Sequence, residues 1–346
     1  MNNPMNTETT TAGQRDTLPT THHPERAKRK GTSFGVQIAK FGLPAILVLE
    51  IIVFSVLKPT LFFTTGTLNT ILINQSVAGI LAIAVLVPLI IGEFDLSVGA
   101  NLGLGAILVV GLSAFYGLPF WASILVSIVA CSIIGLINGL LITRLGVNSF
   151  VTTLGIQTAL TGCVLWFTGG NVIYENVPPE LVAIGSGSVF GIPIPVLVMV
   201  VIAIVMYYML NQTPVGRYLY ALGGSKEASR LSGLNVRGLT LFAFVLAGLL
   251  AGIAGVVLSA KLGSGNPTVG ASFLLPGFAA VFLGATAFRP GTFNVLGTIF
   301  AVFVIATGIY GLNLLGVPFF VEPIFTGLVL VAAVAATRYL RKERTQ

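Results

Sequence analysis

Ionisable side chains are scarce in the hydrophobic part of this chain, so the few acids there are the first candidates for chemistry. Glu50, Glu93 and Asp95 lie in or between long apolar runs, and Glu322 lies near the end of one. Because a charge in lipid is energetically costly, each acid is either a functional group or a paired structural one. Glu50 has no obvious partner close in sequence, so we expect it to face the inside of a helix bundle.

Two of these acids fall at a break between apolar runs, shortly after Pro88. Asp95 and Ser97 can cap the helix that follows, whose first N–H groups would otherwise lack partners. Capping is the simpler interpretation. A position at a gate is compatible with it, since broken helices at membrane depth are tolerated where they are buried or line water.

Amide and hydroxyl side chains within the apolar runs could bind a solute. Both groups can donate and accept hydrogen bonds, so they suit a neutral, hydroxyl-rich solute better than an ion. Each of them alone could equally form an interhelical hydrogen bond. With the acids of the break, the candidates for a translocation pathway are Asn74, Gln75, Glu93, Asp95, Ser97, Asn101, Asn138, Thr153 and Gln157, and Ser76, Asn148, Thr152, Asn294 and Asn313 share their character.

Other kinds of chemistry are excluded by what the sequence lacks. No His lies in an apolar run, which argues against a metal site and metalloprotease chemistry. No G-x-x-x-x-G-K-[ST] motif is present, and GGSK at 223–226 lacks its spacing, so we expect no ATP hydrolysis and no cofactor in this chain. A membrane-embedded enzyme would need a clustered nucleophile, base or metal set, and the scarcity of acids argues against one.

The elements that position these residues are predicted to be transmembrane helices. Mean hydropathy is +0.97 and only 8% of residues are charged, against about 25% in ordinary soluble domains. We therefore predict an all-α polytopic membrane protein. Ten spans are expected, at 41–58, 68–92, 98–116, 119–143, 147–168, 194–212, 240–261, 272–288, 292–312 and 317–337.

The distribution of charge predicts the topology. With both termini in the cytoplasm, sixteen of the 18 Lys and Arg residues fall on the cytoplasmic side, and only Lys58 and Lys261 fall outside. The positive-inside rule thus explains the net charge of +7 without a nucleic-acid partner. We expect a disordered cytoplasmic tail at 1–33, a transmembrane domain at 34–337 and a basic cytoplasmic tail at 338–346.

Residues 213–239 form the one long basic segment between spans, and their pattern predicts two short capped helices. Thr213 is the N-cap of the first helix, Pro214 its first residue and Gly223 its end; Ser225 caps the second. A capped helix needs a surface to pack on, so we expect either a docking element for a soluble partner or a solvated loop with nascent helices. The charged residues of this segment are Arg217, Lys226, Glu227, Arg230 and Arg237.

Glycine patterns suggest close helix contacts and a repeat. The small residues of 247–255 recur at a spacing that lets helices approach closely. The segments 92–105 (GEFDLSVGANLGLG) and 284–297 (GATAFRPGTFNVLG) share a glycine, a polar break and a Gly-rich continuation, which is a weak sign of an internal repeat.

Four motifs resemble one known family. GEFDLSVG at 92–99 is similar to the GGIDLSVG signature of ribose-type ABC importer permeases. Asn138-Gly139 with FVTTLG at 150–155, ALGGSKEASRLSGLNV at 221–236 and GLNLLGV at 311–317 resemble further motifs of that family, in the same order. The resemblance covers about residues 68–335.

The resemblance implies a subunit of a binding-protein-dependent monosaccharide importer in the bacterial plasma (inner) membrane. Two permease copies, identical or different, would form the pathway, two ATPase subunits carrying ATP and Mg²⁺ would dock in the cytoplasm, and an extracytoplasmic binding protein would deliver the solute. Phe150 joins the pathway candidates through its motif. The residues implied in coupling to the ATPase are Arg217, Gly223, Gly224, Lys226, Glu227, Ala228, Arg230, Ser232 and Gly233.

The chain departs from the family pattern at two places. Glu93 stands where the signature has its second glycine, and LLPGFAA at 274–280 stands where many members have ELDAIAA. These changes leave the solute open among sugars, sugar alcohols and furanone-type signalling molecules. The competing hypothesis is a secondary transporter of a small neutral solute driven by protons or sodium, which would work alone and would use Glu50, Glu93 or Asp95 as a titrating group.

Overall fold

The computed structural model describes residues 33–345, with the side chains of residues 41–340, and it is almost entirely helical. The predicted tail at 1–33 lies outside these residues except for Ser33, which is the first residue of α1. The long helices are α1 (Ser33–Leu57), α2 (Thr65–Ile90), α3 (Val98–Tyr116), α4 (Phe120–Arg144), α5 (Ser149–Thr168), α7 (Ile194–Gln212), α10 (Val236–Leu262), α12 (Val295–Leu314) and α13 (Val321–Thr345). The predicted basic end of the chain continues α13 as far as Thr345.

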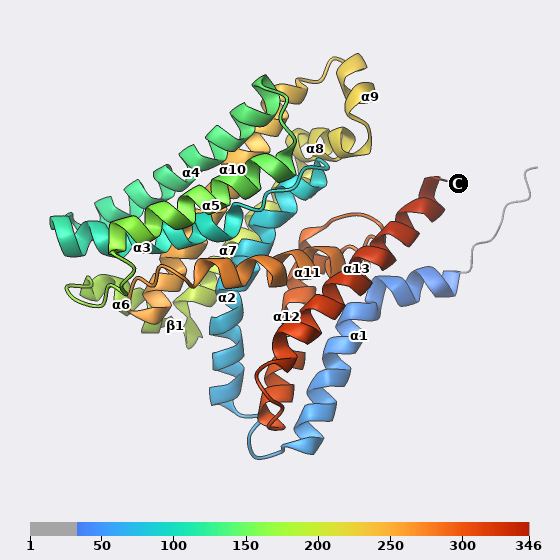
Figure 1. Ribbon diagram of the computed structural model, residues 1–346. Helices are drawn as coiled ribbons and strands as arrows, with labels where there is room; N and C mark the ends of the chain where they lie inside the picture. Colours follow the sequence, from blue (N-terminus) through green and yellow to red (C-terminus); the bar gives the residue numbers. More distant parts are fainter. Residues whose placement is uncertain (1–32, 346) are drawn as a thin grey trace, which may run out of the picture.

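Short elements connect the long ones. They are α6 (Pro179–Ser186), the hairpin of β1 (Ser188–Val189) and β2 (Ile192–Pro193), α8 (Pro214–Gly224), α9 (Lys226–Leu231), the 3-10 helix η1 (Gly270–Phe273) and α11 (Leu274–Gly284). The two strands pair antiparallel, Ser188 with Pro193 and Val189 with Ile192. Figure 1 shows α8 and α9 at one end of the molecule, with α6 and β1 toward the other.

Eight of the described helices are long and apolar enough to cross a membrane. The polytopic α-helical class is therefore confirmed. The other two predicted spans correspond to Phe41–Leu57, which is part of α1, and to the shorter apolar helix Gly270–Gly284. The predicted span at 272–288 is too long, because α11 has 11 residues and measures about 16 Å, half of the hydrocarbon core.

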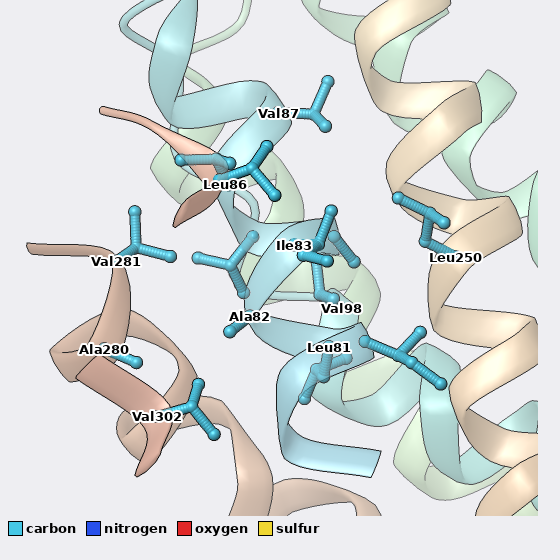
Figure 2. Close-up of a cluster of buried hydrophobic side chains, with 14 of the residues drawn as sticks. Leu81, Ala82, Ile83, Leu86, Val87, Val98, Leu250, Ala280, Val281 and Val302 are labelled. Carbon is cyan, nitrogen blue, oxygen red and sulfur yellow. The ribbon is translucent and has the colours of Figure 1, made fainter. Parts of the chain in front are cut away.

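The core is built around α2. Every residue of α2 from Gly79 to Ile90 is buried, and the helix packs against α7, α10, α11 and α12. A helix that is apolar on all sides belongs at the centre of a bundle. Figure 2 shows the side chains of α2 between Val281 of α11 and Leu250 of α10. A second, smaller cluster joins α3, α6 and α10 around Leu181.

Glycines let α10 lie directly against α3 and α4, as the small-residue pattern predicts. A Cβ atom at Gly248 would overlap the backbone of Cys131 in α4, and one at Gly255 would overlap Leu102 in α3. Because lipid offers helices no hydrophobic gain on association, such close packing is a main source of their affinity for one another.

Glu50 also faces the bundle, as predicted: a Cβ atom at Gly308 of α12 would lie 3.3 Å from its Oε1.

Candidate functional site

The basic segment folds as two capped helices, as its sequence predicts. The Thr213 hydroxyl accepts a hydrogen bond from the Gly216 N–H at 3.4 Å, and Pro214 is the first residue of α8. The Ser225 hydroxyl accepts from the Ala228 N–H at 3.2 Å and caps α9. Gly233, at φ 79°, follows the end of α9 in the left-handed conformation that favours glycine.

One prediction about this segment is wrong. Gly223 does not end α8, which continues to Gly224. A Cβ atom at Gly223 would overlap the carbonyl oxygen of Ile90, the last residue of α2. Glycine is favoured both at helix ends and where two backbones lie in close contact. At position 223, the close contact with Ile90 explains the glycine. Gly223 therefore brings α8 against the end of the central helix.

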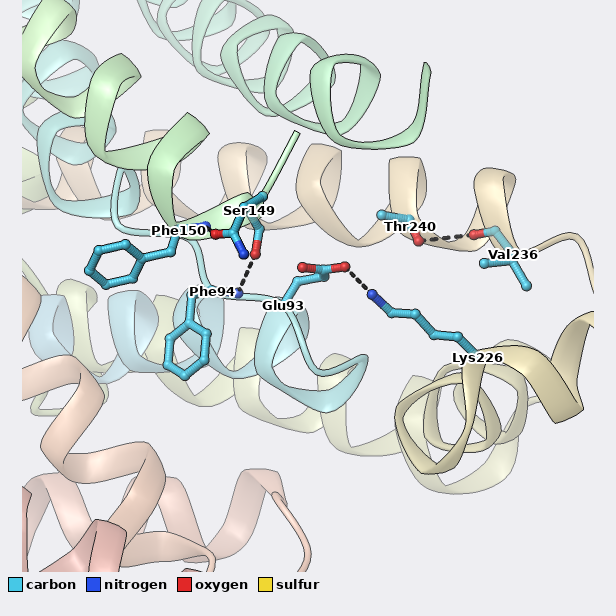
Figure 3. Close-up of polar contacts among 8 residues, drawn as sticks. Glu93, Phe94, Ser149, Phe150, Lys226, Val236 and Thr240 are labelled. Carbon is cyan, nitrogen blue, oxygen red and sulfur yellow. Dashed lines mark hydrogen bonds and ion pairs between the residues drawn. The ribbon is translucent and has the colours of Figure 1, made fainter. Parts of the chain in front are cut away.

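The α8–α9 segment contacts two turns of the transmembrane domain. At the turn between α2 and α3 (residues 91–97), Glu93 forms an ion pair with Lys226, and Figure 3 shows the two side chains directed toward each other. At the turn between α11 and α12 (residues 285–294), the Tyr220 hydroxyl donates to the Phe293 carbonyl at 2.8 Å. Movement of α8 and α9 would thus displace both turns.

A buried network of polar groups fixes the α2–α3 turn. The Asn138 Nδ2 group donates to the Ser97 hydroxyl at 2.8 Å, and that hydroxyl donates to Asp95 Oδ1 at 2.6 Å. The Ser97 N–H donates to the same carboxylate oxygen at 3.0 Å. Burial raises the pKa of Asp95 to about 6, and the bonds from Ser97 oppose that rise. The carboxyl group thus holds the start of α3 against α4.

This arrangement corrects the predicted caps. Ser97 occupies the N-cap position of α3 but makes no side-chain cap bond. Asp95 accepts from the N–H two residues later, an Asx turn in front of the helix rather than a cap within it. The start of α5 supplies further partners, because the Phe94 N–H donates to the Ser149 hydroxyl at 3.3 Å and the Leu96 N–H to the Thr153 hydroxyl at 3.0 Å.

The α11–α12 turn depends on Asn294. Its Oδ1 accepts from the Gly297 N–H at 2.7 Å and caps α12. Its Nδ2 donates to the carbonyl oxygens of Gly284 at 3.3 Å and Ala287 at 3.2 Å. The segments 92–105 and 284–297 resemble each other in sequence. Each of them includes residues of a turn that contacts the α8–α9 segment.

The remaining pathway candidates fall into two groups. In the first group, Asn101 donates a hydrogen bond from its amide to the Cys131 carbonyl at 3.0 Å. Phe150 and Gln157 also belong to this group, because they lie on α5 and line no cavity with the other candidates; Phe150 has 49% of its surface exposed. Asn74 and Gln75 line a cavity of about 420 Å³ between α2, α10, α12 and the η1–α11 segment. The structure therefore does not bring all the candidates together.

The cavity contains side chains that the sequence interpretation did not select as site residues. These are Lys261, Ser272 and Tyr310, and they line it together with the two amides of α2 and with Asn313 and Glu322, whose polarity the sequence analysis had noted. The spacing of residues along two helices could have indicated this cavity. One face of α2 carries Ile71, Asn74, Gln75 and Ala78, and one face of α12 carries Ala306, Ile309, Tyr310 and Asn313. Polar residues at this period indicate one wet face on an apolar helix.

Comparison with known proteins places the chain in a family. The family described as "Branched-chain amino acid transport system / permease component" matches residues 67–334. The chain is 34% identical over 297 residues to the ribose import permease of Haemophilus influenzae, covering 85% of this chain and 91% of the relative. It is 30% identical over 318 residues to the D-allose transport system permease of Escherichia coli, covering 92% and 97%.

A third relative is the autoinducer 2 import system permease of Photorhabdus laumondii, 30% identical over 303 residues, 85% of this chain and 90% of the relative. No solved structure matches the chain at a significant level. The matched region includes the α8–α9 segment, both turns and the cavity. The chain is thus a multi-pass inner-membrane protein and belongs to this family of ABC importer permeases.

Proposed function

We propose that this chain forms the translocation pathway of an ATP-driven importer and is coupled through α8 and α9 to a separate ATPase. The observation that carries the proposal is the double contact of this segment with the α2–α3 and α11–α12 turns, through Lys226 and Tyr220. A partner that moves the segment would change the arrangement of both turns together. Such rigid-body motion is a common way of switching between two states.

The outer surface of α9 suits a soluble partner. Ser229 is its buried residue, whereas Glu227 and Arg230 are exposed and Leu231 has 80% of its surface exposed. Arg is enriched among the residues that contribute most to binding at protein interfaces, and the exposed Leu beside it offers apolar surface that a partner could bury. The inner surface of α8 is already packed on the transmembrane domain through Leu219 and Leu222. The segment can therefore bind a partner on one side and transmit its motion on the other.

The proposed solute is a monosaccharide or a related small polyol. The relatives carry ribose, D-allose and autoinducer 2 in their names. The cavity is lined by amides and hydroxyls, which match the donors and acceptors of a sugar. The proposed partners are a cytoplasmic ATPase that binds ATP and Mg²⁺, an extracytoplasmic binding protein and a second permease copy.

Co-purification in mild detergent with the candidate ATPase and binding protein tests this proposal. ATP hydrolysis by the purified complex is measured with D-ribose, D-allose and D-fructose. Stimulation by one sugar, only when all components are present, is the expected result. Absence of association, together with uptake by this chain alone in proteoliposomes under an ion gradient, would favour an ion-coupled secondary transporter instead.

A further inference from the structure

The cavity of about 420 Å³ is separate from the turns that contact α8 and α9. Asn74 lies 16 residues before Ile90 in α2, or about 24 Å along the helix axis. Between them, α2 is buried on all sides from Gly79 to Ile90. The cavity therefore lies beside the half of α2 that is remote from the α8–α9 segment, and under the proposed function this is the extracytoplasmic half.

Several side chains in this cavity have hydrogen-bonding groups without protein partners. Within the described part of the chain, no hydrogen bond or ion pair joins the side chain of Asn74, Gln75 or Lys261 to another residue. All three are half-buried. Polar groups in transmembrane helices are unfavourable in lipid and typically face a polar interior or a water-filled cavity. These three side chains are thus available to a solute.

The lining defines the class of solute. A volume of about 420 Å³ lies within the range of about 300–1,000 Å³ typical of small-molecule sites. Asn74, Gln75 and Asn313 offer both donors and acceptors, and the Tyr310 hydroxyl adds another of each. One cation, Lys261, and one acid, Glu322, leave the lining without net charge. An uncharged polyhydroxylated molecule fits these properties better than an anion or a cation.

We infer that this cavity is the site that receives the solute on the extracytoplasmic side, with Gln75 and Lys261 as specificity-determining residues for a monosaccharide-sized polyol. The inference rests on the proposed function. It selects Asn74 and Gln75 from the candidate pathway and adds Lys261, which comes from α10, a helix that packs against α2. A solute bound by the amides of α2 and the ammonium group of α10 would lose part of these contacts if the two helices moved apart.

Uptake by the complete transporter in proteoliposomes, with D-ribose as the probe, tests these two residues. Gln75→Leu and Lys261→Met are each expected to raise the KM for D-ribose about tenfold through loss of one hydrogen bond to the solute. Lys58→Met is the matched control, because Lys58 lies in the α1–α2 turn and does not line the cavity. An unchanged KM in both cavity variants would overturn the inference.

A labelling experiment separates this inference from the proposed coupling. Gln75→Cys is made in a Cys163→Ser background, since Cys163 is exposed and Cys131 is buried. D-ribose with its binding protein should slow reaction of the new thiol with a membrane-impermeant reagent, without any need for ATP. Unslowed labelling alongside normal wild-type uptake overturns the cavity assignment. Protection by ribose without ATP-dependent uptake overturns the proposed ATPase coupling and leaves the cavity as the solute site.

Discussion

Lys226, the first residue of α9, forms an ion pair with Glu93, which lies 133 residues earlier in the α2–α3 turn. The lysine side chain is 51% exposed and the glutamate side chain 11%. The carboxylate thus stands at the boundary between the transmembrane domain and the surface. The pair therefore joins the α8–α9 segment to the α2–α3 turn across a long separation in sequence.

Breaking this ion pair should impair coupling more than folding. Exposed ion pairs contribute about 0–1 kcal/mol to stability. Because the Lys226 side chain is half-exposed and can be solvated without its partner, Glu93→Gln is expected to leave thermal unfolding nearly unchanged. Sugar-stimulated ATP hydrolysis by the reconstituted complex should fall severalfold, since α9 would no longer be held to the turn. The measurement is the ratio of stimulated to basal hydrolysis.

The charge-reversed pair provides the control. Glu93→Lys alone should reduce stimulation further, and Glu93→Lys combined with Lys226→Glu should restore much of it. Failure of the double variant to recover any activity would mean that Glu93 acts through something other than Lys226.

Gly223 should tolerate no side chain. Gly223→Ala places a methyl group on the Ile90 carbonyl oxygen, so α8 must move away from the end of α2. Overpacking of this kind typically destabilises by about 1–3 kcal/mol. Thermal unfolding of the purified chain in detergent is expected to occur at a lower temperature.

Its neighbour is the matched control for folding, because a Cβ atom at Gly224 would have nothing within 4 Å. Gly224→Ala should leave the unfolding temperature near that of the wild type. Equal unfolding temperatures in the two variants would contradict the close contact between α8 and α2.

Local sequence signals predicted the caps of this region well, and long-range contacts are where they failed. Thr213 and Ser225 are recognisable because a cap depends on residues three positions away. Gly223 satisfied the pattern of a helix end, yet its role depends on Ile90, which no local pattern identifies. For the same reason, Ser97 was predicted as a cap, whereas its hydroxyl bonds to Asp95 and Asn138 instead.

The predicted span at 272–288 shows the limit of hydropathy. The residues of α11 are apolar, and so are most of those that follow it at 285–288. Hydropathy therefore gives no sign that the helix ends at Gly284. The helix stops at Gly284 because this glycine packs on Gly297 and because the Asn294 amide binds the carbonyl oxygens of Gly284 and Ala287. The cavity was partly predictable, since Asn74 and Gln75 were selected for their polarity, but Lys261 joins them only through packing of α10 beside α2.

Arg230 should be required for docking of the ATPase. Arg230 is exposed on α9, so reversing its charge with Arg230→Glu should leave the fold unaffected. Co-purification with the ATPase and sugar uptake are both expected to be lost, while affinity for the binding protein is retained. Normal uptake by this variant would overturn the assignment of α9 as the docking element.

Asp95 should make stability depend on pH. Its pKa is raised from 3.8 to about 6 by burial, so the folded state binds the proton more tightly than the unfolded state does. The resulting stabilisation is present in full below about pH 4 and is lost as pH rises through about 6. A difference of two units corresponds to a change on the order of 3 kcal/mol.

Asp95→Asn removes the ionisable group and retains an oxygen that can accept from Ser97. Thermal unfolding of both proteins between pH 4 and pH 8 should therefore show a decline for the wild type that the variant lacks, and the difference between the two curves isolates Asp95 from the other acids. Transport by the variant should remain substantial if the carboxyl group only holds the start of α3. Complete loss of transport by a stably folded Asp95→Asn protein would instead show that the charge itself is used in the transport cycle.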